Sequence, residues 1–183
     1  MNRIEFAHRQ MRQYPERMGR PPHVPRYVQL GKDVYIADGV QFAPQGFGFI
    51  KEKGKWLHIP HVGGIVIEGD VYIGANTVIA RATALGSVTY IGTGTKIDAL
   101  VHIAHNVHIG RNCLIIAMST IGGSCELGNN VYIGEGVTVR DHVKIATGVF
   151  IGCGSNVVKD CDKIGWVYMG NPARPIRERT KDD

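Results

Sequence analysis

The chain of 183 residues is poor in aromatic residues and in cysteine, and it has no hydrophobic run long enough to cross a membrane. Aromatic residues make up 8% of the chain and hydrophobic residues 44%, so a core must be built mainly from aliphatic side chains. The four cysteines form no CxxC pair and follow no signal peptide. We therefore expect reduced thiols, no bound metal, no membrane insertion and a cytoplasmic location.

The charge of the chain is modest. The formal net charge is +5, an excess that suits phosphate groups or an acidic carrier protein but that many solvated surfaces also carry. We expect no nucleic-acid partner. Residues 1–20 are rich in arginine, and their apolar residues at spacings of three and four predict a short amphipathic helix. A transit peptide fits less well, because serine is absent there and Glu5 and Glu16 interrupt the basic run.

A six-residue period dominates the sequence. Every sixth residue from Ile67 to Val157 is a branched aliphatic, sixteen in succession. Six residues contain three two-residue strand repeats, so the period predicts a short strand followed by a corner. The residue two places before each aliphatic position is small or β-branched, and both should face the interior. Three hexads make an eighteen-residue coil, so sixteen predict a little over five stacked coils, roughly 25 Å tall.

This pattern resembles the hexapeptide-repeat, left-handed parallel β-helix family. The handedness is implied by the resemblance alone, since ordinary parallel crossovers are right-handed. We expect an all-β chain with a basic N-terminal segment over residues 1–26, the β-helix over 27–162 and an irregular tail over 163–183. A glycine-rich excursion near residues 43–64 should interrupt the helix, and the proline-containing tail should form neither a regular helix nor a central strand.

The densest polar cluster, residues 97–110, contains three histidines at a spacing of three. Such a spacing invites a metal site. The hexad pattern, however, places His102 and His108 on adjacent faces of the prism, so one subunit could not direct both at one ion. A zinc site shared between subunits stays open as an alternative, as in trimeric β-helical carbonic anhydrases, which resemble this chain only in the repeat. We interpret His102 and His108 as solvated side chains.

His105 differs from these two histidines. It occupies an outward position just after a corner, and Asp98 lies seven residues earlier on the same coil. A carboxylate can fix the tautomer of an imidazole and raise its basicity. Eighteen residues after His105, and so one coil above it, is Gly123, whose backbone N–H should be accessible to a ligand oxygen. A base, its partner and a bare amide are the parts that an acyl transfer needs.

The stretch Ile97-Asp98-Ala99-Leu100-Val101-His102-Ile103-Ala104-His105-Asn106-Val107 resembles the active-site signature of the UDP-3-O-(3-hydroxyacyl)glucosamine N-acyltransferases of the lipid A pathway. Three further segments share the resemblance, which covers roughly residues 44–160: Gly46-Phe47-Gly48-Phe49, Trp56 with Ile59-Pro60, and Ile73-Gly74-Ala75-Asn76-Thr77-Val78-Ile79.

The resemblance implies a role for each matching residue. His105 would be the general base, Asp98 its partner and the Gly123 amide the oxyanion donor. His142 would be a second functional histidine, near the acceptor or the oxyanion. Arg81 and Asn106 would contribute to substrate binding.

The chain also departs from this family. The family carries a separate uridine-binding domain, whereas only about 25 residues precede the first hexads here, and its Ile-Asp-Arg-Gly is replaced by Ile79-Ala80-Arg81-Ala82. The family's long C-terminal helices, which help to dock acyl carrier protein, are missing. The tail from Val167 to Arg174 instead resembles the ending of coenzyme A-dependent hexapeptide acetyltransferases. That likeness implies that Asn171 and Arg174 lie near the acyl donor.

The excursion carries three aromatic residues, Phe47, Phe49 and Trp56. Exposed rings on a glycine-rich loop can stack on a base or a sugar. They can equally seal the end of the prism or pack on a neighbouring subunit. Because the uridine-binding domain is missing, we favour binding of the acceptor.

The sequence is therefore interpreted as that of an amino-sugar N-acyltransferase that acts as a homotrimer. Its co-substrate would be acyl-CoA or an acyl carrier protein, its acceptor a nucleotide-linked amino sugar, and it would need no permanently bound cofactor. Two alternatives remain: a metal-dependent enzyme of the carbonic anhydrase type, and a non-catalytic β-helical scaffold.

Overall fold

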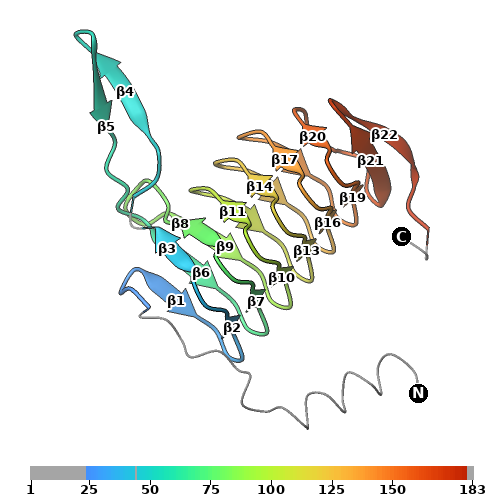
Figure 1. Cartoon of the computed structure of the whole chain (residues 1–183), viewed down its shortest axis with the longest axis horizontal. Coiled ribbons are helices and arrows are strands. Elements are labelled where there is room, and N and C mark those ends of the chain that lie inside the picture. The colour runs from blue at the N-terminus through green and yellow to red at the C-terminus, as the bar shows by residue number, and fades with distance from the viewer. Residues whose placement is uncertain (1–23, 44, 181–183) are drawn as a thin grey trace.

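The computed structural model describes residues 24–43 and 45–180, so the helix expected near the N-terminus lies outside the described residues. The described chain winds around a three-sided prism whose walls are three sheets (Figure 1). In spatial order, sheet A contains β1 (Val28–Leu30), β6 (Gly64–Ile67), β9 (Val88–Ile91), β12 (His108–Ile109), β15 (Glu126–Leu127) and β18 (Lys144–Ile145).

Sheet B contains β2 (Tyr35–Ile36), β7 (Tyr72–Ile73), β10 (Lys96–Ile97), β13 (Leu114–Ile115), β16 (Tyr132–Ile133), β19 (Phe150–Ile151), β21 (Trp166–Gly170) and β22 (Ala173–Glu178). Sheet C contains β3 (Gln41–Ala43), β8 (Val78–Ala80), β11 (His102–Ile103), β14 (Thr120–Ile121), β17 (Thr138–Val139) and β20 (Asn156–Val157). Each coil gives one strand to each sheet, and the result is the expected left-handed parallel β-helix of hexapeptide repeats.

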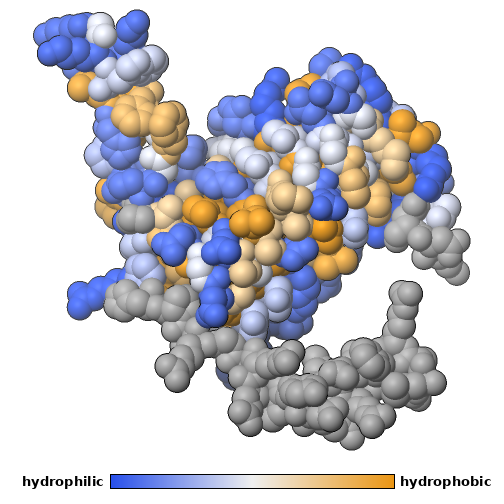
Figure 2. All heavy atoms as spheres, in the orientation of Figure 1, coloured by the Kyte–Doolittle hydropathy of each residue, from blue (hydrophilic) through white to orange (hydrophobic). Residues whose placement is uncertain are grey.

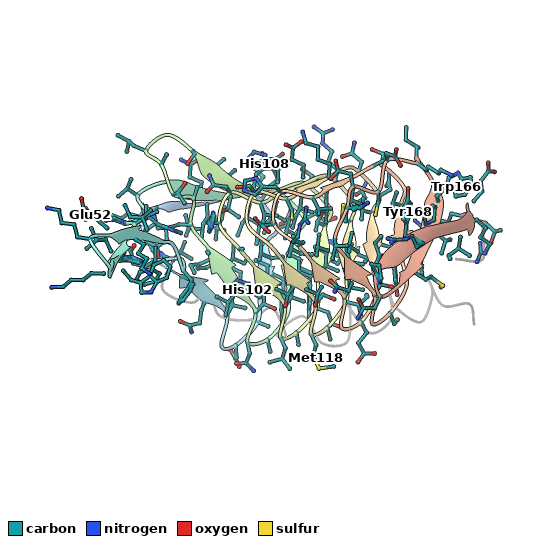
Figure 3. All side chains as sticks on the ribbon, turned by 90° about the horizontal axis from the view of Figure 1, so that it is seen from above. Glu52, His102, His108, Met118, Trp166 and Tyr168 are labelled. Atoms are coloured by element: carbon teal, nitrogen blue, oxygen red, sulfur yellow. The ribbon has the colours of Figure 1, made fainter. Side chains whose placement is uncertain are left out.

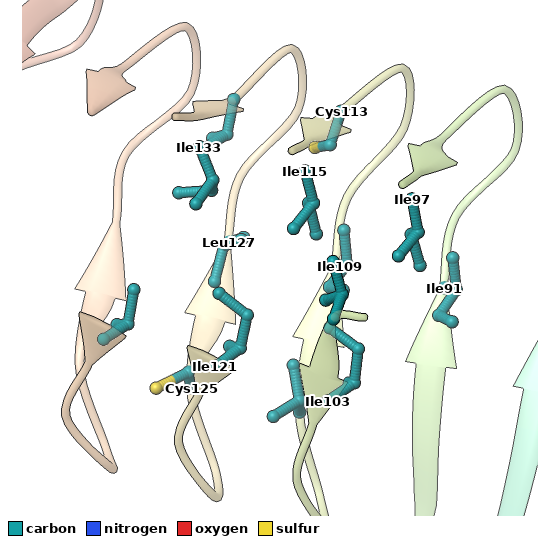
Figure 4. Packing of buried hydrophobic residues seen from close by; sticks show 14 of the residues in the cluster. Ile91, Ile97, Ile103, Ile109, Cys113, Ile115, Ile121, Cys125, Leu127 and Ile133 are labelled. Carbon is teal, nitrogen blue, oxygen red and sulfur yellow. The ribbon is translucent and has the colours of Figure 1, made fainter. Parts of the chain in front are cut away.

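The interior of the prism is aliphatic and fully enclosed. Ile103, Ile109 and Ile115 come from three different walls, gather in the interior and are 0% exposed (Figure 4). The residues two positions before the aliphatic ones are buried as well, among them Cys113 and Cys125. The assignment of the two inward positions is therefore confirmed for these coils. The four cysteines are free thiols, and Cys153 is the exposed one.

One of the sixteen hexads does not form a wall. Its aliphatic residue, Leu85, is 88% exposed and lies in the turn between β8 and β9. Ile67 consequently pairs with Ile91, twenty-four residues later, whereas Ile91 pairs with Ile109, eighteen residues later. The expectation that Leu85 faces the interior is wrong. A turn lengthened by one whole hexad leaves the phase of the period unchanged, so the sequence pattern does not distinguish it from a strand.

Between β3 and β6, much of the chain forms a β-hairpin. Strands β4 (Phe49–Glu52) and β5 (Lys55–His58) pair antiparallel and project away from the prism (Figure 1). The C-terminal tail is more regular than expected, because β21 and β22 form a second antiparallel pair at the end of sheet B. Pro175 is tolerated there because β22 is an edge strand. Among the described residues, no helix is long and apolar enough to cross a bilayer.

Candidate functional site

The candidate site lies on one edge of the prism, which we call the C–A edge. Here each strand of sheet C leads into the next strand of sheet A, through the turns 45–63, 81–87, 104–107, 122–125 and 140–143. The first two turns are long, and the first contains the β4–β5 hairpin. Because neighbouring coils are only about 4.8 Å apart, side chains on successive turns of this edge touch.

His105 lies in the turn between β11 and β12, and its neighbour Asn106 fixes the tautomer of its ring. The Asn106 Oδ1 accepts a hydrogen bond from the backbone N–H of Thr83 (3.1 Å), so the atom at this place must be the oxygen. The same oxygen lies 3.1 Å from His105 Nδ1. The Nδ1 atom must therefore carry the proton and donate it to Asn106. In the neutral ring Nε2 is then the unprotonated nitrogen, as a general base requires.

Asn106 is held in place by the long turn 81–87 and by strand β9, which follows it. Its backbone N–H donates to Thr89 Oγ1 (3.0 Å), and its side-chain Nδ2 donates to Ser87 Oγ (3.4 Å). Its φ of +60° is in the left-handed region, which asparagine adopts more readily than most residues. The sequence predicted Asn106 as a substrate-binding residue, and in the structure its side chain supports His105.

Gly123 lies on the turn one coil above His105, as the eighteen-residue repeat predicts. A Cβ atom at this position would lie 2.7 Å from Cε1 and 2.9 Å from Nε2 of His105, so only glycine leaves room for the ring. The backbone N–H of Gly123 donates to no acceptor among the residues that the structure describes. The residue that carries this unpaired N–H therefore lies against the edge of the His105 ring that holds the unprotonated nitrogen.

Asp98 is not brought to His105 within one chain. It follows β10 on the edge between sheets B and C, where its Oδ1 accepts the backbone N–H of Ala99 at 2.7 Å. His105 follows β11 on the C–A edge, and Asn106 takes the place beside its Nδ1. The seven-residue separation spans strand β11 of sheet C, so the two residues lie on different edges of the prism although they belong to one coil. A partnership of Asp98 with His105 would require a neighbouring subunit.

His61 is a residue of this site to which the sequence assigned no role. It lies between the hairpin and β6, is 1% exposed, and packs its ring edge-to-face on His105 with centroids 5.0 Å apart and an interplanar angle of 82°. Its Nδ1 accepts the backbone N–H of Gly46 (3.0 Å), while its buried Nε2 has no hydrogen-bond partner among the described residues. Burial lowers the pKa of His61, and repulsion from His105 lowers it further.

The three aromatic residues predicted to bind the acceptor lie in the hairpin or in the segment that leads into it. Phe47 is 92% exposed and Trp56 67% exposed, and together with Phe49 they line a hollow of about 450 Å³. Phe49 contacts His58, and His58 stacks near His61, so rings follow one another from the hairpin to His105. Figure 2 shows the hydrophobic stem of the hairpin below a hydrophilic tip.

Arg81 and His142 occupy different places on the same edge. The Arg81 Nε donates to the carbonyl of Gly63 (2.7 Å), and its guanidinium lies over the ring of Tyr27 at 4.2 Å. Arg81 thus clamps the base of the excursion. The side chain of His142 is 74% exposed and lies two coils above His105, roughly 10 Å away along the prism.

A groove of about 880 Å³ runs along the outer face of sheet A, from Asn106 to Asp160 and Asp162. At its far end a smaller hollow of about 300 Å³ is lined by these same two aspartates and by Arg174. Asn171 lies apart from both, because its Oδ1 accepts from Asn156 of β20 in sheet C. Of the two tail residues implicated, Arg174 alone reaches this path.

The three histidines of the polar cluster are not brought together. His102 lies on sheet C and His108 on sheet A, as expected, and Figure 3 shows them on different faces. Among the residues that the structure describes, no three His, Cys, Asp or Glu side chains converge on one point.

We expect His61 to make stability depend on pH. Its folded-state pKa lies below the ordinary value of about 6.5, so the unfolded chain takes up a proton before the folded chain does. The contribution of His61 to the free energy of unfolding should be fully present above about pH 6.5. As the pH decreases below that value, the free energy of unfolding should fall by at most about 1.4 kcal/mol per pH unit. Urea unfolding at pH 8 and pH 5.5, at one protein concentration, measures this.

The matched variant for that measurement is His61→Gln, which should make the pH dependence shallower. His102, whose pKa is also lowered by desolvation, adds a smaller effect of the same sign because its side chain is largely exposed. An equal slope in the variant and in the natural chain would show that His61 is not the titrating group.

The fold and the site define a class of protein: a hexapeptide-repeat β-helix with a histidine, a supporting amide side chain and a bare backbone N–H on one edge. The repeats match the family model "Bacterial transferase hexapeptide (six repeats)" over residues 89–123 and 108–141. The fold is similar to that of a UDP-N-acetylglucosamine acyltransferase from Bacteroides fragilis 9343, with 21% identity over 81% of this chain and 55% of that chain and a TM-score of 0.71. Another UDP-N-acetylglucosamine acyltransferase structure gives 26% identity and a TM-score of 0.66, over 83% of this chain and 63% of that one.

Curated relatives are similar over a shorter stretch. A UDP-3-O-acylglucosamine N-acyltransferase from Ectopseudomonas mendocina (strain ymp) is 50% identical over 62 residues, which are 33% of this chain and 18% of that protein. A UDP-3-O-acylglucosamine N-acyltransferase 2 from Nitrobacter winogradskyi is 43% identical over 67 residues, 34% of this chain and 20% of that protein. The chain therefore spans about a fifth of the length of these relatives.

Proposed function

We propose that this protein transfers an acyl group from a phosphopantetheine thioester to the amine of an amino sugar. The observation that carries the proposal is the geometry around His105. Asn106 holds the proton on Nδ1, so Nε2 is free to accept one, and Gly123, whose N–H is unpaired among the described residues, lies against that edge of the ring. The similarity to acyltransferases of lipid A sugars supports the reaction class and suggests the acceptor.

The reaction would proceed by direct attack. The amine nitrogen attacks the thioester carbon, and His105 Nε2 takes a proton from that nitrogen. The Gly123 N–H donates a hydrogen bond to the oxygen on which negative charge develops. Collapse of this intermediate breaks the carbon–sulfur bond, and the departing thiolate takes the proton back from His105. The products are an amide and a free pantetheine thiol, with no covalent enzyme intermediate.

The donor would lie along the groove of sheet A. Within the groove, Asn106 and Asp160 are three coil spacings, or roughly 14 Å, apart along the prism, and Arg174 lies in the hollow next to Asp160. An extended pantetheine arm fits such a path, with its phosphate towards Arg174. The outer faces of the prism also suit lateral packing, and we propose a homotrimer in which a neighbouring subunit closes this groove and supplies Asp98 to His105.

A direct assay tests the proposal. The purified protein is incubated with nucleotide-linked amino sugars and either acyl-CoA or acylated carrier protein, and amide formation is followed by mass spectrometry together with thiol release. We expect one thiol released per amide formed, and none with an N-acetylated acceptor, which has no free amine. Thioester hydrolysis without amide formation would contradict the assignment.

The hairpin gives a prediction for the acceptor. We expect Phe47→Ala to raise the acceptor KM about tenfold, or about 1.4 kcal/mol, because the ring is free to stack on a sugar or base. The donor KM should change little, since Phe47 does not line the groove of sheet A. Steady-state kinetics with each substrate varied measures both. If the variant dissociates or melts early with an unaltered acceptor KM, the aromatic residues serve assembly and the acceptor binds elsewhere.

A further inference from the structure

The buried ring of His61 is unusual because it is enclosed by glycines and yet leaves a polar atom unpaired. A Cβ on Gly46 would lie 2.1 Å from its Cε1, and a Cβ on Gly48 would lie 3.1 Å from its Nε2. The base of the hairpin is thus shaped around this imidazole. An unsatisfied buried donor costs about 1–3 kcal/mol, so a compensating role is expected.

The ring of His61 completes the surroundings of His105. Asn106 Oδ1 lies at the Nδ1 edge of His105, and Gly123 lies so close to the Cε1–Nε2 edge that a Cβ there would overlap the ring. The edge-to-face contact with His61 occupies a third side. A half-turn of His105 about its Cβ–Cγ bond would move Nδ1 away from Asn106 and remove the selection of the tautomer. His61 opposes that rotation by packing.

We propose that His61 is a positioning residue that holds the His105 ring in the orientation in which Nε2 accepts the substrate proton. This inference rests on the proposed function of His105 as the base. His61 contacts His105 and contributes through the shape of its ring. Its protonation is disfavoured first because burial desolvates the ring and then because the charges that face it, on His105, His58 and Arg81, would repel a proton. The backbone of Arg81 acts in the opposite direction.

The attachment of the hairpin does not depend on His61 alone. Backbone hydrogen bonds also join the hairpin base to itself and to the turn 81–87: Ile59 N–H to Gly48 O, Val62 N–H to Thr83 O, and Gly63 N–H to Ala82 O. The clamp by Arg81 adds a further bond. Replacing the His61 side chain should therefore leave the hairpin in place.

Two substitutions separate packing from hydrogen bonding. His61→Gln keeps a polar group that can bond Gly46 but removes the ring, and His61→Phe keeps a ring against His105 but removes the bond. We expect His61→Gln to lower kcat about tenfold with the acceptor KM within about twofold, and His61→Phe to stay within about threefold of the natural kcat. The control His102→Gln removes an imidazole on the outer face of sheet C, away from His105 and the hairpin, and should leave kcat unchanged.

A second measurement needs no turnover. Long-range proton–nitrogen NMR spectra of the imidazoles at pH 8 report the tautomer of His105, whose signal is identified by its loss in His105→Gln. We expect the single Nδ1–H tautomer in the natural chain and in His61→Phe, and an averaged signal in His61→Gln. Thermal melts identify any variant that is merely unfolded.

The outcomes distinguish the two ideas. Full kcat and a single tautomer in His61→Gln would overturn the positioning role, as would an active His61→Gln with an inactive His61→Phe. If the natural chain transfers no acyl group to any amine, the proposed function fails, and the NMR comparison still decides whether His61 orients His105.

Discussion

Replacing His105 with alanine should lower kcat for amide formation by about 10²–10⁴, the usual range for loss of a general base. The substitution removes the unprotonated Nε2 that faces Gly123 but no part of the prism interior, because His105 lies outside the wall in a turn. We therefore expect the variant to keep its oligomeric state and its melting temperature. Initial rates at saturating substrate concentrations measure kcat, light scattering measures the oligomeric state, and a thermal melt measures the melting temperature.

The control for His105→Ala is His102→Ala. His102 lies on the same coil, on the outer face of sheet C, and contributes nothing to the C–A edge. The His102→Ala variant should retain the kcat of the natural chain. Near-natural turnover in His105→Ala with an authentic acceptor would remove His105 as the base, and equal losses in both variants would point to a general effect on the coil.

The second large effect concerns stability and uses two residues of the same hexad position. Ile115 is 0% exposed, so Ile115→Asp places a carboxylate among aliphatic side chains with no partner. We expect a loss of more than about 4 kcal/mol of unfolding free energy, or a melting temperature lower by about 10 °C or more. Leu85→Asp makes the same chemical change at an 88% exposed residue and should stay within about 0.5 kcal/mol.

This pair of variants tests the interpretation of the extra hexad. If Leu85→Asp is as damaging as Ile115→Asp, Leu85 faces an apolar surface and the turn 81–87 is not an open loop. If Ile115→Asp leaves the melting temperature unchanged, the inward positions of the repeat are assigned out of phase. Circular-dichroism melts at one protein concentration are sufficient for both comparisons.

The case of Asp98 and His105 shows where reasoning from the repeat is incomplete. The repeat places Gly123 one coil above His105, and the structure confirms that these two residues touch. It also places Asp98 on the same coil as His105, but the two residues lie on different edges of the prism, with strand β11 of sheet C between them. Stacking is set by the period, whereas contact between residues of one coil depends on which edge each turn occupies.

The sequence shows that Asn106 follows His105, but it does not predict that the Asn106 side chain accepts a hydrogen bond from His105 Nδ1. That function depends on Thr83, which is brought near by the lengthened turn. His61 was visible as one of several histidines in a glycine-rich excursion. The one available signal was the pair Gly46 and Gly48, whose missing side chains make room for the ring.

The sequence by itself determined the prism, because a six-residue alternation of buried and exposed positions can be satisfied only by short strands and corners that repeat in phase. It also determined that His105 and Gly123 are neighbours, since their separation is one coil. Only the tertiary structure decided which hexad leaves the wall and that Asn106 and His61 surround His105 from two different turns. The physical reason is that a period fixes the spacing along the wall, whereas the path of each long turn is set by its own hydrogen bonds and packing.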